Sequence, residues 1–290
     1  MGRYCFLKEV APYRSSGHGD QAPTIIPQIG FIEKQLNTGA PRLPSSHSRR
    51  TNLVVLSMAA SLGIATGGAN ALTTYESTVT CPIDGKQFIS TMVASFYQSG
   101  MRLDSKPLGA LIAPYPYPVC PGNGFVMYQA EFSKDELTAI RAIVLTDDYR
   151  RLRNQHTNYC MVGYVKERLE GEDYDLGNMY LRASWEAESE RPALVQQYQA
   201  LAIAKYDAFL KGDSTRSEDW WYAAVVAAEL DRLLGHFNAV EIRLKDLPTA
   251  PDSSLTLAIS QIRFHALNHN LKQEKPLSPK EQAIGSGRIR

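Results

Sequence analysis

Apolar side chains recur every three or four residues through most of the region from residue 132 to residue 271. That spacing places them on one face of an α-helix, where they can pack against a neighbouring helix. Short polar or proline-containing breaks divide the pattern, and such short connections favour antiparallel helix hairpins. The predicted helices begin at about residue 134 and then cover 149–153, 157–169, 173–188, 192–211, 222–233, 239–247 and about 255–266.

Three of these helices carry clear end signals. Ser133 and Glu136 form the outline of a capping box, in which each side chain accepts a hydrogen bond from the backbone of the other residue. Thr146 precedes two aspartates and predicts a second amino-terminal cap. Gly235 follows Leu233 at the place where a glycine ends a helix.

Residues 72–131 show a different pattern, organised by two matching loops, Cys81-Pro82-Ile83-Asp84-Gly85 and Cys120-Pro121-Gly122-Asn123-Gly124. Each loop has the outline of a zinc knuckle whose second cysteine is replaced, by Asp84 in one and by Asn123 in the other. The apolar run at 86–97 fits either strand or helix, prolines impose extended chain at 107–118, and residues 125–128 predict a strand. The chain is therefore predicted to be mainly α with a small β-rich cysteine module, an α+β protein.

Cys81 and Cys120 occupy equivalent positions in the two loops, which favours a disulfide between them. Such a bond would close a loop of about 40 residues and contribute on the order of 3–4 kcal/mol. A zinc site is the alternative, with Cys81, Asp84 and Cys120 as ligands and a fourth ligand that neutral Asn123 supplies poorly. Free thiols are the remaining possibility. Cys160 falls within a helical pattern, which indicates a buried core cysteine.

The segment 49–71 resembles a signal peptide in its order of parts. Arg49-Arg50 precede an apolar stretch from Leu53 to Ala65, and Ala69-Asn70-Ala71 supplies a small-x-small cleavage site. The arginine pair also partly matches a twin-arginine signal, so general and twin-arginine export both remain open. The rest of the leader, residues 1–48, shows no sustained period and is predicted to be disordered, and the polar tail 272–290 is predicted to be flexible. These features predict a periplasmic or secreted protein without a stable membrane span after cleavage.

The charged residues are informative when they are counted separately for the first 71 residues and for the rest of the chain. The first 71 residues hold seven basic and three acidic residues, which leaves 24 basic and 27 acidic of the 31 and 30 in the whole chain. The body is therefore mildly acidic, which argues against nucleic acid as a partner. The composition is otherwise that of a globular protein, with 44% hydrophobic residues.

Several of these positions together resemble a bacterial family of unknown function in which a Cys-Pro module precedes tetratricopeptide-like helices. The resembling residues span about 80–245 and are Cys81-Pro82, Asp84-Gly85, Leu103-Asp104, Cys120-Pro121, Asn123-Gly124-Phe125, Phe132-Ser133, Leu181-Arg182-Ala183 and Trp185. Members with cysteine at the Asp84 and Asn123 positions look like zinc binders. The resemblance implies tetratricopeptide-like helix hairpins on a degenerate zinc ribbon, and it implies no known activity.

The sequence contains few residues in patterns typical of catalysis or metal binding. His265 and His269 are four residues apart, the spacing of two zinc ligands on a helix, but no glutamate lies between them to act as a base. We find no nucleophile elbow, P-loop or dinucleotide fingerprint. The leading hypothesis is an exported, non-enzymatic protein that binds another protein or a peptide and needs no cofactor. A zinc-binding module and an enzyme of unrecognised type are the alternatives.

Overall fold

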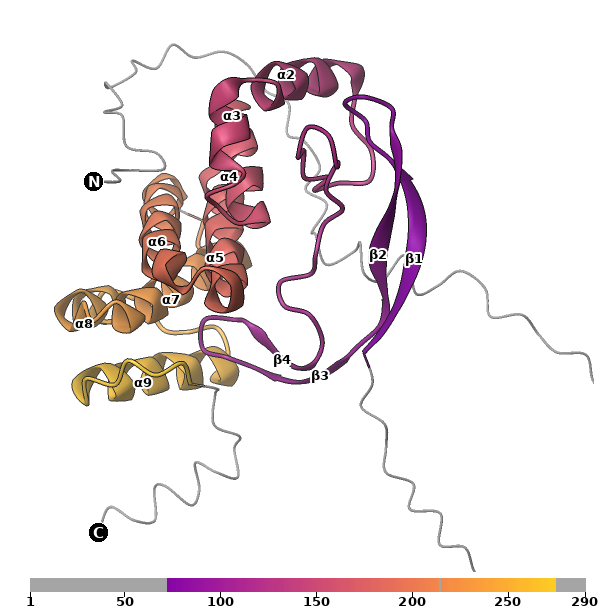
Figure 1. Cartoon of the computed structure of the whole chain (residues 1–290). Helices are drawn as coiled ribbons and strands as arrows, with labels where there is room; N and C mark the ends of the chain where they lie inside the picture. Colours follow the sequence, from indigo (N-terminus) through magenta and orange to yellow (C-terminus); the bar gives the residue numbers. More distant parts are fainter. Residues whose placement is uncertain (1–71, 214, 275–290) are drawn as a thin grey trace, which may run out of the picture. The chain divides into compact units, whose positions relative to one another are not determined.

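The helical pattern folds into eight α-helices within the part of the chain that the computed structural model describes, residues 72–213 and 215–274 (Figure 1). The helices are α2 Lys134–Val144, α3 Asp147–Leu152, α4 Asn158–Arg168, α5 Asp173–Glu190, α6 Val195–Gly212, α7 Glu218–Leu233, α8 Phe237–Lys245 and α9 Ser253–Leu267, with a 3-10 turn η1 at Pro192–Leu194. Two antiparallel strand pairs precede them: β1 Thr73–Thr80 with β2 Gln87–Ser95, and β3 Tyr97–Met101 with β4 Pro107–Ala110. The mainly helical α+β class is thus confirmed.

The predicted helix ends are confirmed in detail. The Ser133 hydroxyl accepts from the Glu136 backbone, and the Glu136 carboxylate accepts from the Ser133 backbone. The Thr146 side chain accepts from the Tyr149 backbone and opens α3. Gly235 takes a φ of 79° just after α7, a conformation that glycine adopts without strain.

Consecutive helices from α4 to α9 pack against one another, with α7 at the centre of the packing. Every residue of α7 from Ala223 to Leu233 is buried, which is the pattern of a helix surrounded by neighbours on all sides. The most extensive contact lies between α5 and α6, where Gly177 faces the ring of Tyr206. A Cβ atom at Gly177 would lie 2.6 Å from that ring, so the absence of a side chain sets the distance between the two helices.

The strand region differs from the prediction in two respects. The strand β1 was not predicted; it pairs with β2 from Thr80↔Gln87 to Thr73↔Ser95. The expected strand at 125–128 was wrong, because only an isolated bridge, Val119↔Val126, forms there. The backbone of Phe125 is instead bonded within the second loop: its N–H donates to the Asn123 side chain and its carbonyl accepts from Cys120.

The described residues all belong to one compact unit. None of their helices combines the length and apolar composition needed to cross a membrane. The predicted leader 1–71 and most of the predicted tail lie outside the described residues. The first three tail residues are described, and they are held in place by contacts with Arg102, Leu103 and Arg232 that are given below.

Candidate functional site

The two cysteine loops have the same backbone hydrogen bonds. In each, the glycine N–H donates to the cysteine carbonyl, over 2.8 Å from Gly85 to Cys81 and 2.9 Å from Gly124 to Cys120. The glycines have φ values of 73° and 75°, in the left-handed region that side chains disfavour. The loops are therefore two copies of one turn, as their sequences indicate.

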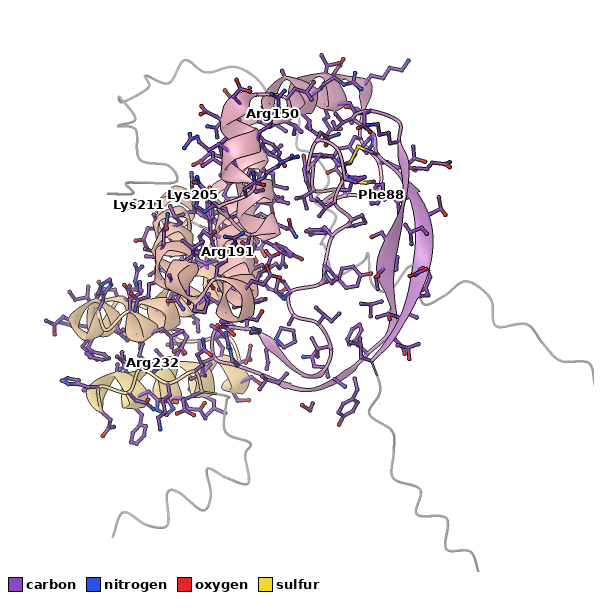
Figure 2. The ribbon with its side chains drawn as sticks, in the orientation of Figure 1. Phe88, Arg150, Arg191, Lys205, Lys211 and Arg232 are labelled. Atoms are coloured by element: carbon purple, nitrogen blue, oxygen red, sulfur yellow. A yellow bond between two sulfur atoms is a disulfide. The ribbon has the colours of Figure 1, made fainter. Side chains whose placement is uncertain are left out.

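Cys81 and Cys120 form the predicted disulfide, and neither residue is exposed (yellow bond in Figure 2). Where a zinc knuckle would carry its second thiolates, the Asn123 amide donates to the Asp84 carboxylate over 3.3 Å and to the Cys81 sulfur over 3.4 Å. Among the residues described, no group of three or more His, Cys, Asp or Glu is placed to hold a metal ion. The disulfide and this amide–carboxylate bond occupy the positions that a four-thiolate zinc site would use.

The other candidates from the sequence have structural roles. The two histidines do not share a helix face, because α9 ends at Leu267; His269 has a φ of 50° and stacks on Phe237 with ring centroids 4.6 Å apart. The ring of His265 is bonded to the Asn270 side chain. Cys160 is fully buried, as predicted.

A buried charge network joins the turn between β3 and β4 to helix α5, and we call it the Arg102 clamp: Arg102, Asp104, Lys106, Trp185 and Glu188. The Asp104 carboxylate is 1% exposed and accepts from four donors: Arg102 Nε and Nη2, Trp185 Nε1 and the Lys106 backbone. Glu188 accepts from Arg102 and from the Lys106 ammonium, the latter over 2.7 Å. Two cations thus face two carboxylates, and the network is neutral.

The pKa shifts of Arg102 and Glu188 both favour the charged forms of these side chains. Burial alone would lower the pKa of Arg102, but hydrogen bonds from its guanidinium to Asp104 and Glu188 hold that pKa above its ordinary value. Burial would raise the pKa of Glu188, yet hydrogen bonds from Arg102 and Lys106 leave it lowered. Charged hydrogen bonds therefore tie the turn to α5.

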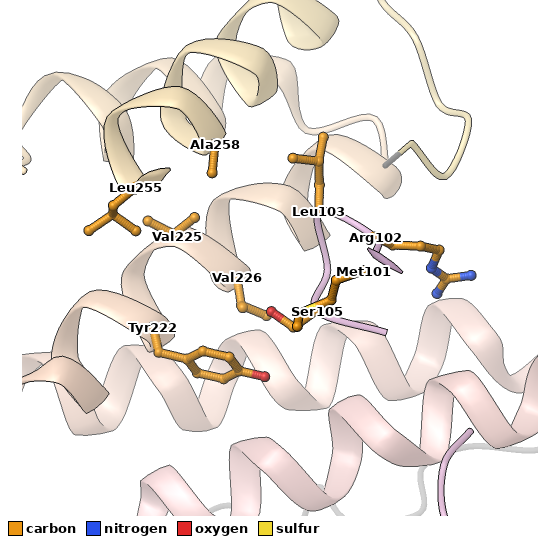
Figure 3. Close-up of a pocket in the computed structure, with 9 residues that line it drawn as sticks. All are labelled: Met101, Arg102, Leu103, Ser105, Tyr222, Val225, Val226, Leu255 and Ala258. Atoms are coloured by element: carbon orange, nitrogen blue, oxygen red, sulfur yellow. The ribbon is translucent and has the colours of Figure 1, made fainter. Parts of the chain in front are cut away.

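Beside the clamp lies a cavity of about 170 Å³, which we call the apolar pocket (Figure 3). Its walls come from the end of β3, the following turn, α7 and α9. Figure 3 shows the Arg102 guanidinium directed away from the other lining residues, so the clamp supports the pocket without entering it. The lining residues are Met101, Arg102, Leu103, Ser105, Tyr222, Val225, Val226, Leu255 and Ala258.

One side of the apolar pocket carries its polar groups. Burial raises the pKa of Tyr222, against a hydrogen bond with the Ser105 side chain that lowers it. Ser105 has a φ of 68°, a conformation that costs a non-glycine residue of order 1 kcal/mol or more. None of the lining residues is a His, Cys, Asp or Glu, and Ser105 and Tyr222 supply the polar side-chain groups on this side. Its chemistry suits the binding of an apolar group.

Further along α7 lies a second buried pair, Glu229 and Arg232, which are 1% and 0% exposed. Burial raises the pKa of Glu229 to about 7, against hydrogen bonds from Arg232 that lower it. Arg232 also donates to the carbonyls of Asn270 and Lys272, in a segment we call the carboxy-terminal strap, residues 270–274. The strap is also bonded to the clamp, through Gln273 to Arg102, and to the same turn through the Glu274 carbonyl, which accepts from the Leu103 backbone.

Sequence reasoning found the disulfide and missed the clamp and the pocket. Asp104 and Trp185 are 81 positions apart in the sequence, and the structure joins them by a 3.0 Å hydrogen bond. The local signal is the alternation of charge in Arg102-Leu103-Asp104-Ser105-Lys106, and nothing in that run marks Glu188 as the partner. Comparison of the chain with known protein families, curated proteins and solved structures finds no match.

Proposed function

We propose that this chain is an exported, non-enzymatic protein that binds another protein or a peptide, and that the apolar pocket receives an apolar side chain of that partner. The observation that carries the proposal is a cavity of about 170 Å³ with apolar walls beside the Arg102 clamp. A cavity of about 150 Å³ lined by apolar side chains accommodates benzene in another protein, so this one has room for a leucine or phenylalanine side chain.

One anchor residue needs support from other contacts. Burying a leucine or phenylalanine side chain contributes about 1.5–3 kcal/mol, far less than a stable complex requires. The strands β3 and β4 pair only with each other among the described strands, and β3 ends at Met101 in the pocket wall. An extended peptide added along β3 would gain main-chain hydrogen bonds and deliver a side chain to the pocket.

Export is supported by two features. The segment 49–71 has the order of parts of a signal peptide. The buried disulfide between Cys81 and Cys120 belongs to an oxidising compartment such as the periplasm or the exterior.

The test is a selection of displayed random peptides on the full-length protein, followed by affinity measurement with two variants. Ala258→Phe would place a ring in the pocket, whereas Ala142→Phe adds the same ring to an exposed position of α2. We expect the selected peptides to share an apolar residue and to lose binding to Ala258→Phe alone. Equal binding to both variants would exclude the apolar pocket as the peptide site.

A further inference from the structure

A second cavity, of about 150 Å³, lies where the loop after β4 meets the start of α4 and the end of α5. One part of its wall is apolar and aromatic, with Pro114, Pro116, Tyr117 and Tyr159. The rings of Tyr117 and Tyr159 lie with centroids 4.9 Å apart, and the Tyr159 hydroxyl is fixed by donating to the Tyr115 carbonyl over 2.6 Å. These contacts hold this part of the wall in place.

The other part of the wall is acidic, with Glu186 and Glu190 from the last turns of α5. The carboxy-terminal end of a helix is its negative pole, where basic side chains are favourable and acidic ones are not. The last turn of α5 contains no basic residue. Its third glutamate, Glu188, is neutralised by Arg102 and Lys106, but Glu186 and Glu190 form no ion pair within the described residues.

The two carboxylates differ in what they already bind. Glu186 accepts from the backbone N–H groups of Asn158 and Tyr159 and so caps α4. Burial raises the pKa of Glu186, and the charge of Glu190 adds to that effect. Glu190 is exposed, and no lysine, arginine or histidine lines the cavity with it. A cation here would relieve the repulsion between the two carboxylates and would contact the tyrosine side chains that line the same cavity.

We propose that this cavity, the amine pocket, binds an alkylammonium group, with Glu190 as its main ionic partner and Tyr117 and Tyr159 as its aromatic wall. The group would be the side chain of a lysine on a partner protein or a free primary amine, which share the same chemistry. The proposal does not depend on the apolar pocket, because the two cavities share no lining residue.

The test is a titration of the full-length protein, labelled on its tyrosine rings, with n-butylammonium, which is the lysine side chain alone. We expect saturable shifts of the Tyr117 and Tyr159 signals, assigned by Tyr→Phe variants, and no such shifts with n-butanol, where a hydroxyl replaces the ammonium. Glu190→Gln should weaken binding by about fivefold, the factor for a partly exposed ion pair of about 1 kcal/mol. Glu131→Gln, which removes an exposed charge elsewhere, should leave it unchanged.

Equal shifts with n-butanol, or equal affinity in Glu190→Gln, would overturn the proposal. The same titration with a lysine-containing tripeptide and its norleucine counterpart separates the two sources. Tighter binding of the lysine peptide than of n-butylammonium assigns the amine pocket to a partner protein. Equal or weaker binding of the peptide assigns it to a free amine.

Discussion

Replacing Asp104 by asparagine changes the Arg102 clamp by one charge and almost no volume. Asp104 is 1% exposed, and Arg102 is 8% exposed. Without the aspartate charge, Arg102 and Lys106 would share Glu188 as the remaining carboxylate of the clamp. Breaking a buried ion pair by removing one partner costs about 3–5 kcal/mol, because it leaves the other charge buried and uncompensated. We expect Asp104→Asn to lower the free energy of unfolding by that amount.

Urea unfolding followed by tryptophan fluorescence measures this change, because Trp185 donates to Asp104 and reports on the clamp directly. Asp147→Asn is the matched control. Its side chain is 95% exposed and pairs with Arg150 one turn later in α3, so its loss should cost less than about 1 kcal/mol. Both variants remove one negative charge, so the difference between their losses in free energy of unfolding measures the effect of burial.

A loss of less than about 1 kcal/mol in Asp104→Asn would refute the reasoning. A double-mutant cycle adds a second criterion. If Arg102 is the charge left uncompensated, combining Arg102→Met with Asp104→Asn should cost less than the sum of the single changes. Strict additivity would show that the two residues do not depend on each other.

Three further changes test other parts of the structure. Cys81→Ser should lower stability by about 3–4 kcal/mol and abolish the effect of reductant on the thermal midpoint; an unchanged midpoint would contradict the stabilising disulfide. The pKa of Glu229 is raised from 4.5 to about 7 in the folded state. Between these two pH values the folded state keeps the carboxyl proton and the unfolded state loses it. Stability should therefore fall by up to about 3 kcal/mol as the pH rises from 4.5 to 7, and Glu229→Gln should remove that dependence in urea titrations; the same slope in the variant would assign it to other groups. Gly177→Ala would overpack the α5–α6 contact and should cost about 1–3 kcal/mol in urea unfolding, whereas no loss would mean that the Tyr206 ring moves freely.

The features that could be predicted from the sequence are those set by neighbours along the chain. The Ser133 capping box, the Gly235 helix end and the two cysteine loops each depend on residues no more than five positions apart. Helical spacing of apolar residues gave the helices for the same reason. Even the disulfide followed from local information, since its two cysteines occupy the same position in two matching turns.

The remaining features depend on distant residues. Arg102 meets Glu188 across 86 positions, and no periodicity in the sequence marks such a contact. A buried aspartate also runs against the expectation that charged residues are exposed, so Asp104 could be placed only once its four donors were seen. The wrong strand at 125–128 has a related cause, because its apolar residues pack as an aromatic cluster with Phe132 and its backbone is bonded within a turn.

The carboxy-terminal strap also affects the order in which contacts can form while the chain is synthesised. Arg102 bonds to Gln273, which is synthesised 171 positions later. At about 5–20 residues per second, the ribosome takes roughly 10–30 seconds to cover that distance. In a chain that folds during its own synthesis, Arg102 can therefore meet Asp104 and Glu188 before Gln273 has been made. The strap residues thus complete a contact that begins in the turn after β3.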